Sequence, residues 1–192
     1  MTPQLHDGDT FTHRGYSFRV NLVPDSDHGN PWDEEGGHGP VSDWRSSDDG
    51  REGERILATD NSGYHALFYD IAEATRIAER DGWGCPCAAS HEAGIDNALS
   101  PSGHPLTRAA EIAHAVEADY ARLRAWCDDN WYYLGVVVTL LDEEGHPTTE
   151  TESLWGIESD SDDYLVEVAH ELAAEILARV EVESPLATLS EN

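Results

Sequence analysis

The chain has 192 residues, with no Lys, only three Cys, one Met and no long apolar run. The longest mostly apolar stretch, Leu134 to Leu141, is far shorter than the roughly 20 residues of a membrane span. Three cysteines are too few for a disulfide framework and are typical of a reducing cytoplasm. The first residues lack the basic and apolar regions of a signal peptide. We therefore expect a soluble cytoplasmic protein that does not contact membranes.

The basic residues are all Arg, and these eleven residues face 39 acidic ones, which gives a formal charge of −28. So large a charge opposes compaction by self-repulsion, and it bears on association and solubility rather than on fold. It excludes direct nucleic-acid binding through a basic patch, because phosphate would be repelled. Two explanations stay open, namely a basic partner surface and a salt-rich solvent. A GC-rich genome also favours Arg over Lys.

The charge is unevenly distributed along the chain. Residues 1–24 carry no net charge, residues 25–60 and 160–192 carry −8 each, and residues 131–159 carry −6. A surface adapted to salt is expected to be more even. The clustering therefore favours a partner-facing surface.

The hydrophobic fraction of 39% and the six Trp are typical of a folded domain rather than an acidic tail. Apolar periodicities and turn residues predict the order β-β-β-α-α-β-β-α. This order indicates a single α+β domain over residues 1–192, with a mainly antiparallel sheet and helices packed on one face. The expected strands are 18–23, 54–60, 64–69, 131–141 and 148–157, the expected helices 71–80, 107–127 and 159–180, and the long irregular segments about 25–53 and 81–105. We expect Asp70 to cap the N-terminus of the helix over 71–80 and Gly82 to end it.

The two longest predicted helices each show an apolar face at spacings of three and four residues. In the helix over 107–127 we expect Trp126 and its neighbours along this face to be buried, while Trp32 and Trp44 are expected to anchor the long loop. The face consists of Ala109, Ile112, Ala113, Val116, Tyr120, Leu123 and Trp126. In the last helix the buried stripe is expected to be Leu165, Val168, Leu172, Ile176 and Val180.

The last helix also carries a row of carboxylates on the side opposite its apolar stripe. Successive members stand four residues apart, which is about 6 Å at a rise of 1.5 Å per residue. Like charges at this spacing destabilise a helix by about 0.2–0.5 kcal/mol per pair, so stability alone does not explain them. The spacing is close to that of phosphates along one nucleic-acid strand; a plain solvated face is the alternative. The row consists of Asp163, Glu167, Glu171 and Glu175.

Two further acidic groups are candidates for the same partner-binding surface. Asp142, Glu143 and Glu144 lie in the turn expected between the last two strands. Asp33, Glu34 and Glu35 lie in the long irregular segment after Pro24, where they also have the simpler interpretation of an acidic loop.

The sequence provides no convincing catalytic or metal-binding motif. Cys85 and Cys87 are separated by one residue, whereas paired zinc ligands are normally separated by two to four, and Cys127 would join them only by chance of folding. Whether Cys85, Cys87 and His91, with His104 further on, bind zinc stays open. The stretch Asp25–Asn30 begins like a calcium loop but lacks the Gly and Glu of that motif. We expect no enzyme activity, no metal and no cofactor.

Seven stretches carry a resemblance to known proteins: Trp32–Glu35, Gly39–Trp44, Arg80–Gly84, Ala115–Tyr120, Trp126–Cys127, Gly135–Leu140 and Glu152–Ser159. Together they resemble a family of small acidic proteins encoded by phages and prophages of GC-rich bacteria, over roughly residues 16–180. The resemblance implies a phage accessory protein and supplies no catalytic residues. The chain departs from the family near residues 45–55, where the family is more basic. Part of the acidity is then attributable to the host or its salt environment.

A compact, very acidic phage protein without a catalytic site is suited to blocking a basic nucleic-acid-binding surface. We expect an inhibitor of a host defence system, an anti-CRISPR or anti-restriction protein, whose carboxylates replace phosphates. The alternatives are a salt-adapted phage accessory protein that does not mimic nucleic acid, and a metal-dependent enzyme. The defence complex and the oligomeric state are left open, a dimer included.

Overall fold

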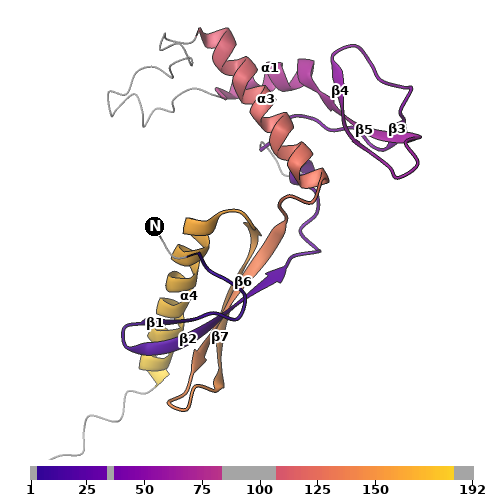
Figure 1. The fold of residues 1–192 in the computed structure, drawn as a ribbon. Helices are drawn as coiled ribbons and strands as arrows, with labels where there is room; N and C mark the ends of the chain where they lie inside the picture. The colour runs from indigo at the N-terminus through magenta and orange to yellow at the C-terminus, as the bar shows by residue number, and fades with distance from the viewer. Residues whose placement is uncertain (1–3, 34–36, 84–106, 184–192) are drawn as a thin grey trace, which may run out of the picture. The chain divides into compact units, whose positions relative to one another are not determined.

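The computed structural model describes residues 4–33, 37–83 and 107–183 (Figure 1). The chain divides into two compact units, unit 1 with residues 1–28 and 131–192 and unit 2 with residues 29–130. Every strand pair that is described is antiparallel, so the predicted α+β class and antiparallel pairing are confirmed. The strands form two sheets, because the chain leaves the first sheet after its first two strands and returns to it only after residue 130. Each unit has its own hydrophobic core, and the single domain predicted over residues 1–192 stays a prediction.

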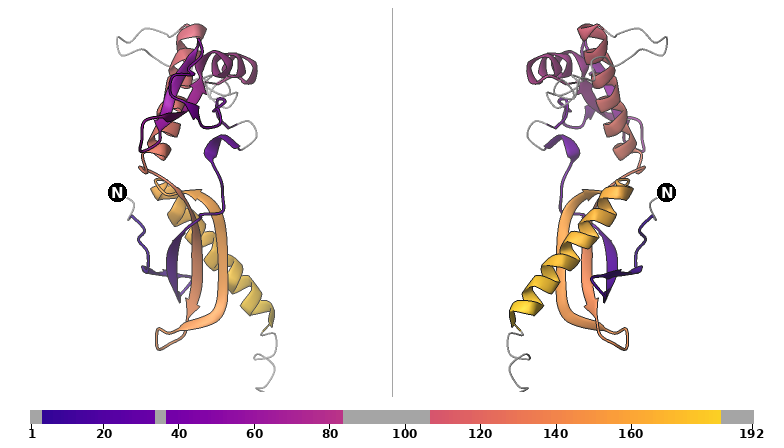
Figure 2. Two further views of the ribbon diagram at one scale, coloured as in Figure 1. Left: turned by 90° about the vertical axis from the view of Figure 1, so that its right-hand side faces the viewer. Right: turned by 90° about the vertical axis from the view of Figure 1, so that its left-hand side faces the viewer.

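Unit 1 is a four-stranded sheet with one helix along one of its faces, as both views of Figure 2 show. The helix packs against β2, β6 and β7, and the strand order is β1-β2-β6-β7. The elements are β1 (Thr10–His13), β2 (Tyr16–Pro24), β6 (Tyr133–Leu141), β7 (Pro147–Glu158) and α4 (Asp162–Glu183).

The core of unit 1 lies between α4 and the sheet. Leu165, Val168, Leu172 and Ile176 are buried as predicted, and Val180 is partly buried against the same core. They meet alternate residues of two neighbouring strands, whose side chains point to one face because strand side chains alternate. Fully burying one such side chain stabilises the fold by about 1.5–3 kcal/mol. The strand residues are Phe18, Val20, Val136 and Val138.

Strand β1 was not predicted, since its four residues Thr-Phe-Thr-His are too short for a clear alternation. It pairs with β2 and is held to α4 by aromatic contacts. The His13 and His170 Nδ1 atoms lie 3.2 Å apart, and the Phe11 ring meets His170 edge-on with a centroid distance of 4.9 Å. His13 Nε2 is buried without a hydrogen-bond partner. Burial first, and then His170 and Arg14, lower the pKa of His13.

This histidine pair makes the stability of unit 1 depend on pH. Because the pKa of His13 is lower in the folded chain, its neutral form favours folding above the ordinary His pKa of about 6.5. That contribution is lost as the pH falls below 6.5 towards the folded-state pKa. In His13→Phe the free energy of unfolding should fall less between pH 7.5 and pH 5.5 than it does in the wild type, because phenylalanine does not titrate. Urea unfolding at both pH values measures it, and equal losses would contradict this role of His13.

Unit 2 is a three-stranded sheet in the order β3-β5-β4 with two helices, α1 and α3, packed together. Asp70 caps the first helix by accepting a hydrogen bond from Glu73 N (2.8 Å), and Gly82 ends it with a φ of 77°, as predicted. The elements are η1 (Pro31–Asp33), β3 (Arg45–Ser46), β4 (Glu54–Thr59), β5 (His65–Asp70), α1 (Ile71–Asp81) and α3 (Arg108–Cys127).

Part of the apolar face predicted for the helix over 107–127 is wrong. Ala109 and Ala113 are exposed and Trp126 is only half-buried, because the side of α3 that meets the sheet is narrower than the sequence pattern. Trp44, expected to anchor the loop, is 52% exposed. The α3 residues that are buried are Ile112, Val116, Tyr120 and Leu123, against Leu57, Leu67, Tyr69, Ala74 and Ala78.

A polar cluster in unit 2 ties α3 to the loop that precedes β3. One oxygen of the Asp119 carboxylate lies 2.5 Å from His38 Nδ1, and the other accepts hydrogen bonds from Gly39 N (2.8 Å) and the Tyr69 hydroxyl (2.6 Å). Burial, and then Asp119, raise the pKa of Tyr69. A side chain on Gly39 would collide with the Tyr69 hydroxyl and with the Cβ of Ala74. A single carboxylate thus holds three groups from two other segments.

The helices that are described include none with the length and apolar content of a membrane span.

Candidate partner-binding surface

The predicted carboxylate row lies on the exposed side of α4 in unit 1. Asp163, Glu167, Glu171 and Glu175 are all exposed, and none forms an ion pair with another described residue. The helix that carries them is fixed by its buried side, so the row has a rigid support. Over the 12 residues from first to last it spans about 18 Å.

Cations are scarce around the row. Unit 1 contains 19 carboxylates and three Arg, whereas unit 2 contains 20 carboxylates and eight Arg. The one Arg of α4, Arg179, turns to β7, where it donates to Glu150 (3.2 Å) and pairs with Glu152. The basic residue nearest in sequence to the row therefore offsets charge on the sheet, and the row keeps its full charge.

The second predicted group, Asp142, Glu143 and Glu144, lies in the exposed turn between β6 and β7, also in unit 1. This turn has a cation nearby, because Arg19 lines the same hollow, of about 500 Å³, as Asp142 and Glu143. Asp142 also has a local role, since its carboxylate accepts a hydrogen bond from His146 N (2.7 Å) and so holds the turn closed. The turn is thus a weaker candidate than the α4 row.

The third predicted group is in the other unit. Asp33 ends η1 in unit 2 and is exposed, and its carboxylate accepts a hydrogen bond from Asn30 Nδ2 (2.8 Å). Glu34 and Glu35 lie outside the described residues. The ten predicted residues therefore do not belong to one compact unit.

No family model, curated protein or solved structure matches the chain. The resemblance to acidic phage proteins stays a prediction.

The predicted metal ligands are only partly described. Cys85, Cys87, His91 and His104 lie outside the described residues. Cys127 is half-buried against the core of unit 2, where burial, followed by Asp128, raises the pKa of its thiol to about 11. The thiol is therefore protonated near neutral pH in the metal-free chain, and a zinc ion would have to displace this proton to bind it.

The calcium-like stretch that begins at Asp25 has a structural role instead. The Asp25 carboxylate accepts hydrogen bonds from Gly156 N (3.2 Å) and Asp27 N (3.3 Å), which links the end of β2 to β7. The His28 ring packs on Tyr133, with a centroid distance of 3.8 Å.

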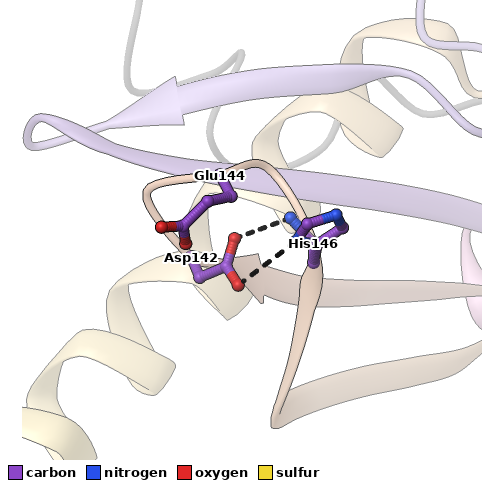
Figure 3. Close-up of side chains that lie close together, drawn as sticks. All are labelled: Asp142, Glu144 and His146. Carbon is purple, nitrogen blue, oxygen red and sulfur yellow. Dashed lines mark hydrogen bonds and ion pairs between the residues drawn. The ribbon is translucent and has the colours of Figure 1, made fainter.

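Three possible metal ligands do meet at the β6–β7 turn. Asp142, Glu144 and His146 each offer an atom within 4.8 Å of the others, and all three side chains are exposed. Figure 3 shows Asp142 and His146 facing each other, and no interaction is drawn to Glu144. His146 Nδ1 lies 3.6 Å from Asp142 Oδ2. The hydrogen bond that closes the turn already explains the position of Asp142.

One surface feature was missed at the sequence level, a hollow of about 540 Å³ in unit 2. Trp32 and Trp126 form two of its walls, with ring centroids 5.2 Å apart and planes at 83°. The only sequence signal was the unusual number of Trp, since residues of the wall are far apart along the chain. The lining consists of Asn30, Trp32, Asp33, Val41, Ser42, Asp43, Trp44, Leu67 and Trp126.

Proposed function

We propose that this protein is a phage-encoded inhibitor of a host defence system that occupies a basic nucleic-acid-binding surface, as an acidic mimic of nucleic acid. The observation that carries the proposal is the row on α4, from Asp163 to Glu175, which is exposed, evenly spaced and free of compensating cations among the described residues. A basic groove built to hold phosphates is complementary to such a row in both charge and spacing.

The distribution of Arg supports a directed surface rather than uniform acidity. In unit 2 most Arg pair locally with carboxylates, as Arg55 does with Glu117 and Arg124 with Asp128. The α4 row has no such pairs. An even solvated surface leaves this contrast unexplained, whereas a surface that meets a cationic partner accounts for it.

Salt adaptation predicts a different physical behaviour and can be tested separately. A salt-adapted chain should unfold in dilute buffer and refold only in molar salt. We expect instead that the protein stays folded in dilute buffer, as measured by circular dichroism between 20 mM and 2 M NaCl.

The proposal is tested by measuring association with purified CRISPR effector complexes and restriction enzymes from GC-rich bacteria. For the complex that is bound, the association rate constant should fall at least about tenfold between 50 and 500 mM NaCl, because salt screens long-range attraction. Surface plasmon resonance at several salt concentrations measures this dependence. A rate unaffected by salt, or no binding to any member of the panel, would contradict the proposal.

A further inference from the structure

We propose that the tryptophan-lined hollow of unit 2 binds the side chain of an arginine on a protein partner. The inference deepens the proposed function and rests on it for the nature of the partner, a basic protein surface. All the residues that line the hollow belong to unit 2.

The walls of the hollow are aromatic and partly accessible. Trp32 and Trp126 are half-buried and meet edge to face, so their rings are fixed at nearly a right angle. Trp44 is 52% exposed and lines the same hollow. A cation over the face of a Trp ring is attracted by the ring quadrupole, and Trp is the best of the aromatic side chains for this interaction.

The hollow also contains two carboxylates without a cation. Asp33 and Asp43 line it and are exposed, and neither forms an ion pair with a described residue. The nearest Arg in sequence, Arg45, is directed elsewhere, since its guanidinium lies 4.2 Å from the centroid of the Phe68 ring and pairs with Glu54. The site therefore combines aromatic faces with unneutralised negative charge.

Arginine matches this combination better than other occupants. Its planar guanidinium stacks on aromatic faces and can donate two parallel hydrogen bonds to a carboxylate, whereas the ammonium of lysine is a strongly hydrated point charge. An anion or a nucleic-acid segment would be repelled by Asp33 and Asp43. An apolar ligand would remove the same carboxylates from water without compensation.

Three matched pentapeptides test the assignment, acetyl-Gly-Gly-Xaa-Gly-Gly-amide with Arg, Lys or the neutral isostere citrulline at the central position. The full chain is labelled with ¹⁵N, and the indole N–H signals of Trp32, Trp44 and Trp126 are followed during titration. The Arg peptide should shift them saturably, the Lys peptide more weakly and the citrulline peptide not at all. No saturable shift, equal shifts with Lys, or equal shifts with citrulline would each overturn the proposal.

Variants locate the binding. Trp44→Ala and Asp43→Asn should each weaken the Arg peptide about fivefold or more, the scale of one cation–π contact or charged hydrogen bond. Asp48→Asn, an exposed carboxylate in the same unit that does not line the hollow, is the matched control and should leave the affinity unchanged. Trp44 and Asp43 are both exposed, so their variants should stay folded. An unchanged amide spectrum confirms that they do. Equal affinity in all three variants would overturn the assignment.

The assay is independent of the α4 row and of any defence complex. The Glu167→Lys/Glu171→Lys variant should bind the Arg peptide as the wild type does, because neither residue lines the hollow. A pocket that binds arginine in a chain that fails to bind any defence complex would refute the proposed function only. If the chain binds a defence complex but its hollow does not bind the Arg peptide, only the pocket is refuted.

Discussion

Replacing Asp119 by Ala is expected to lower the free energy of unfolding of unit 2 by about 3 kcal/mol or more. The carboxylate holds His38, Gly39 N and the Tyr69 hydroxyl, and each buried group left without a partner costs about 1–3 kcal/mol. Tyr69 is fully buried, so water cannot replace the lost acceptor at its hydroxyl. Urea unfolding followed by the indole signals of Trp32 and Trp126 measures the change in unit 2 itself.

Glu117→Ala is the matched control, two residues earlier on the same helix. Glu117 is exposed and accepts two hydrogen bonds from Arg55, a surface ion pair worth at most about 1 kcal/mol. Tyr69→Phe removes one donor only and should cost about 1 kcal/mol. If Asp119→Ala cost no more than Glu117→Ala, the cluster would not hold the loop to α3.

Reversing two charges in the row, Glu167→Lys with Glu171→Lys, is expected to reduce the association rate with the target at least about tenfold at low salt. The helix should stay folded, because both side chains are exposed and contribute nothing to the core of unit 1. New opposite-charge pairs form with Asp163 and Glu175, each worth about 0.2–0.5 kcal/mol, and offset the new Lys–Lys repulsion. Binding kinetics and thermal unfolding separate the two effects.

The matched control is Asp48→Lys with Asp49→Lys, which changes the net charge equally but lies in an exposed turn of unit 2. If binding depends on the row, this variant should associate within about threefold of the wild-type rate at the same salt concentration, because the row itself is unchanged. Equal losses in both double variants would mean that net charge, and not the α4 row, controls association.

Much of the fold was predictable because its elements have strong local signals. The Asp70 cap, the Gly82 stop and the apolar stripe of α4 each follow from a few neighbouring residues, and the structure confirms them. The division into two units was not predictable, since it depends on β2 pairing with β6 across more than a hundred residues. Strand β1 is too short to show a period, and Ala109 and Ala113 fit the helix period although nothing packs on them.

The candidate sites differ in the same way, since one follows from a local pattern and the others depend on residues far apart in the sequence. The α4 row is periodic within one helix, so the sequence predicted its position and the structure places it on an exposed face. The Asp119 cluster and the tryptophan hollow join residues up to about 95 positions apart, from the loop before β3 to the last turn of α3. No local pattern marks such a site. It becomes visible only when the fold brings Trp32 and Trp126 together.

Competition with nucleic acid tests the central claim most directly. Fluorescently labelled duplex DNA is bound to the purified defence complex, and the protein is added at several DNA concentrations. We expect the DNA to be released, with the protein concentration needed for half-release rising in proportion to the free DNA, because both ligands need the same basic surface. A ternary complex in which the DNA stays bound at saturating protein would contradict mimicry through the α4 row.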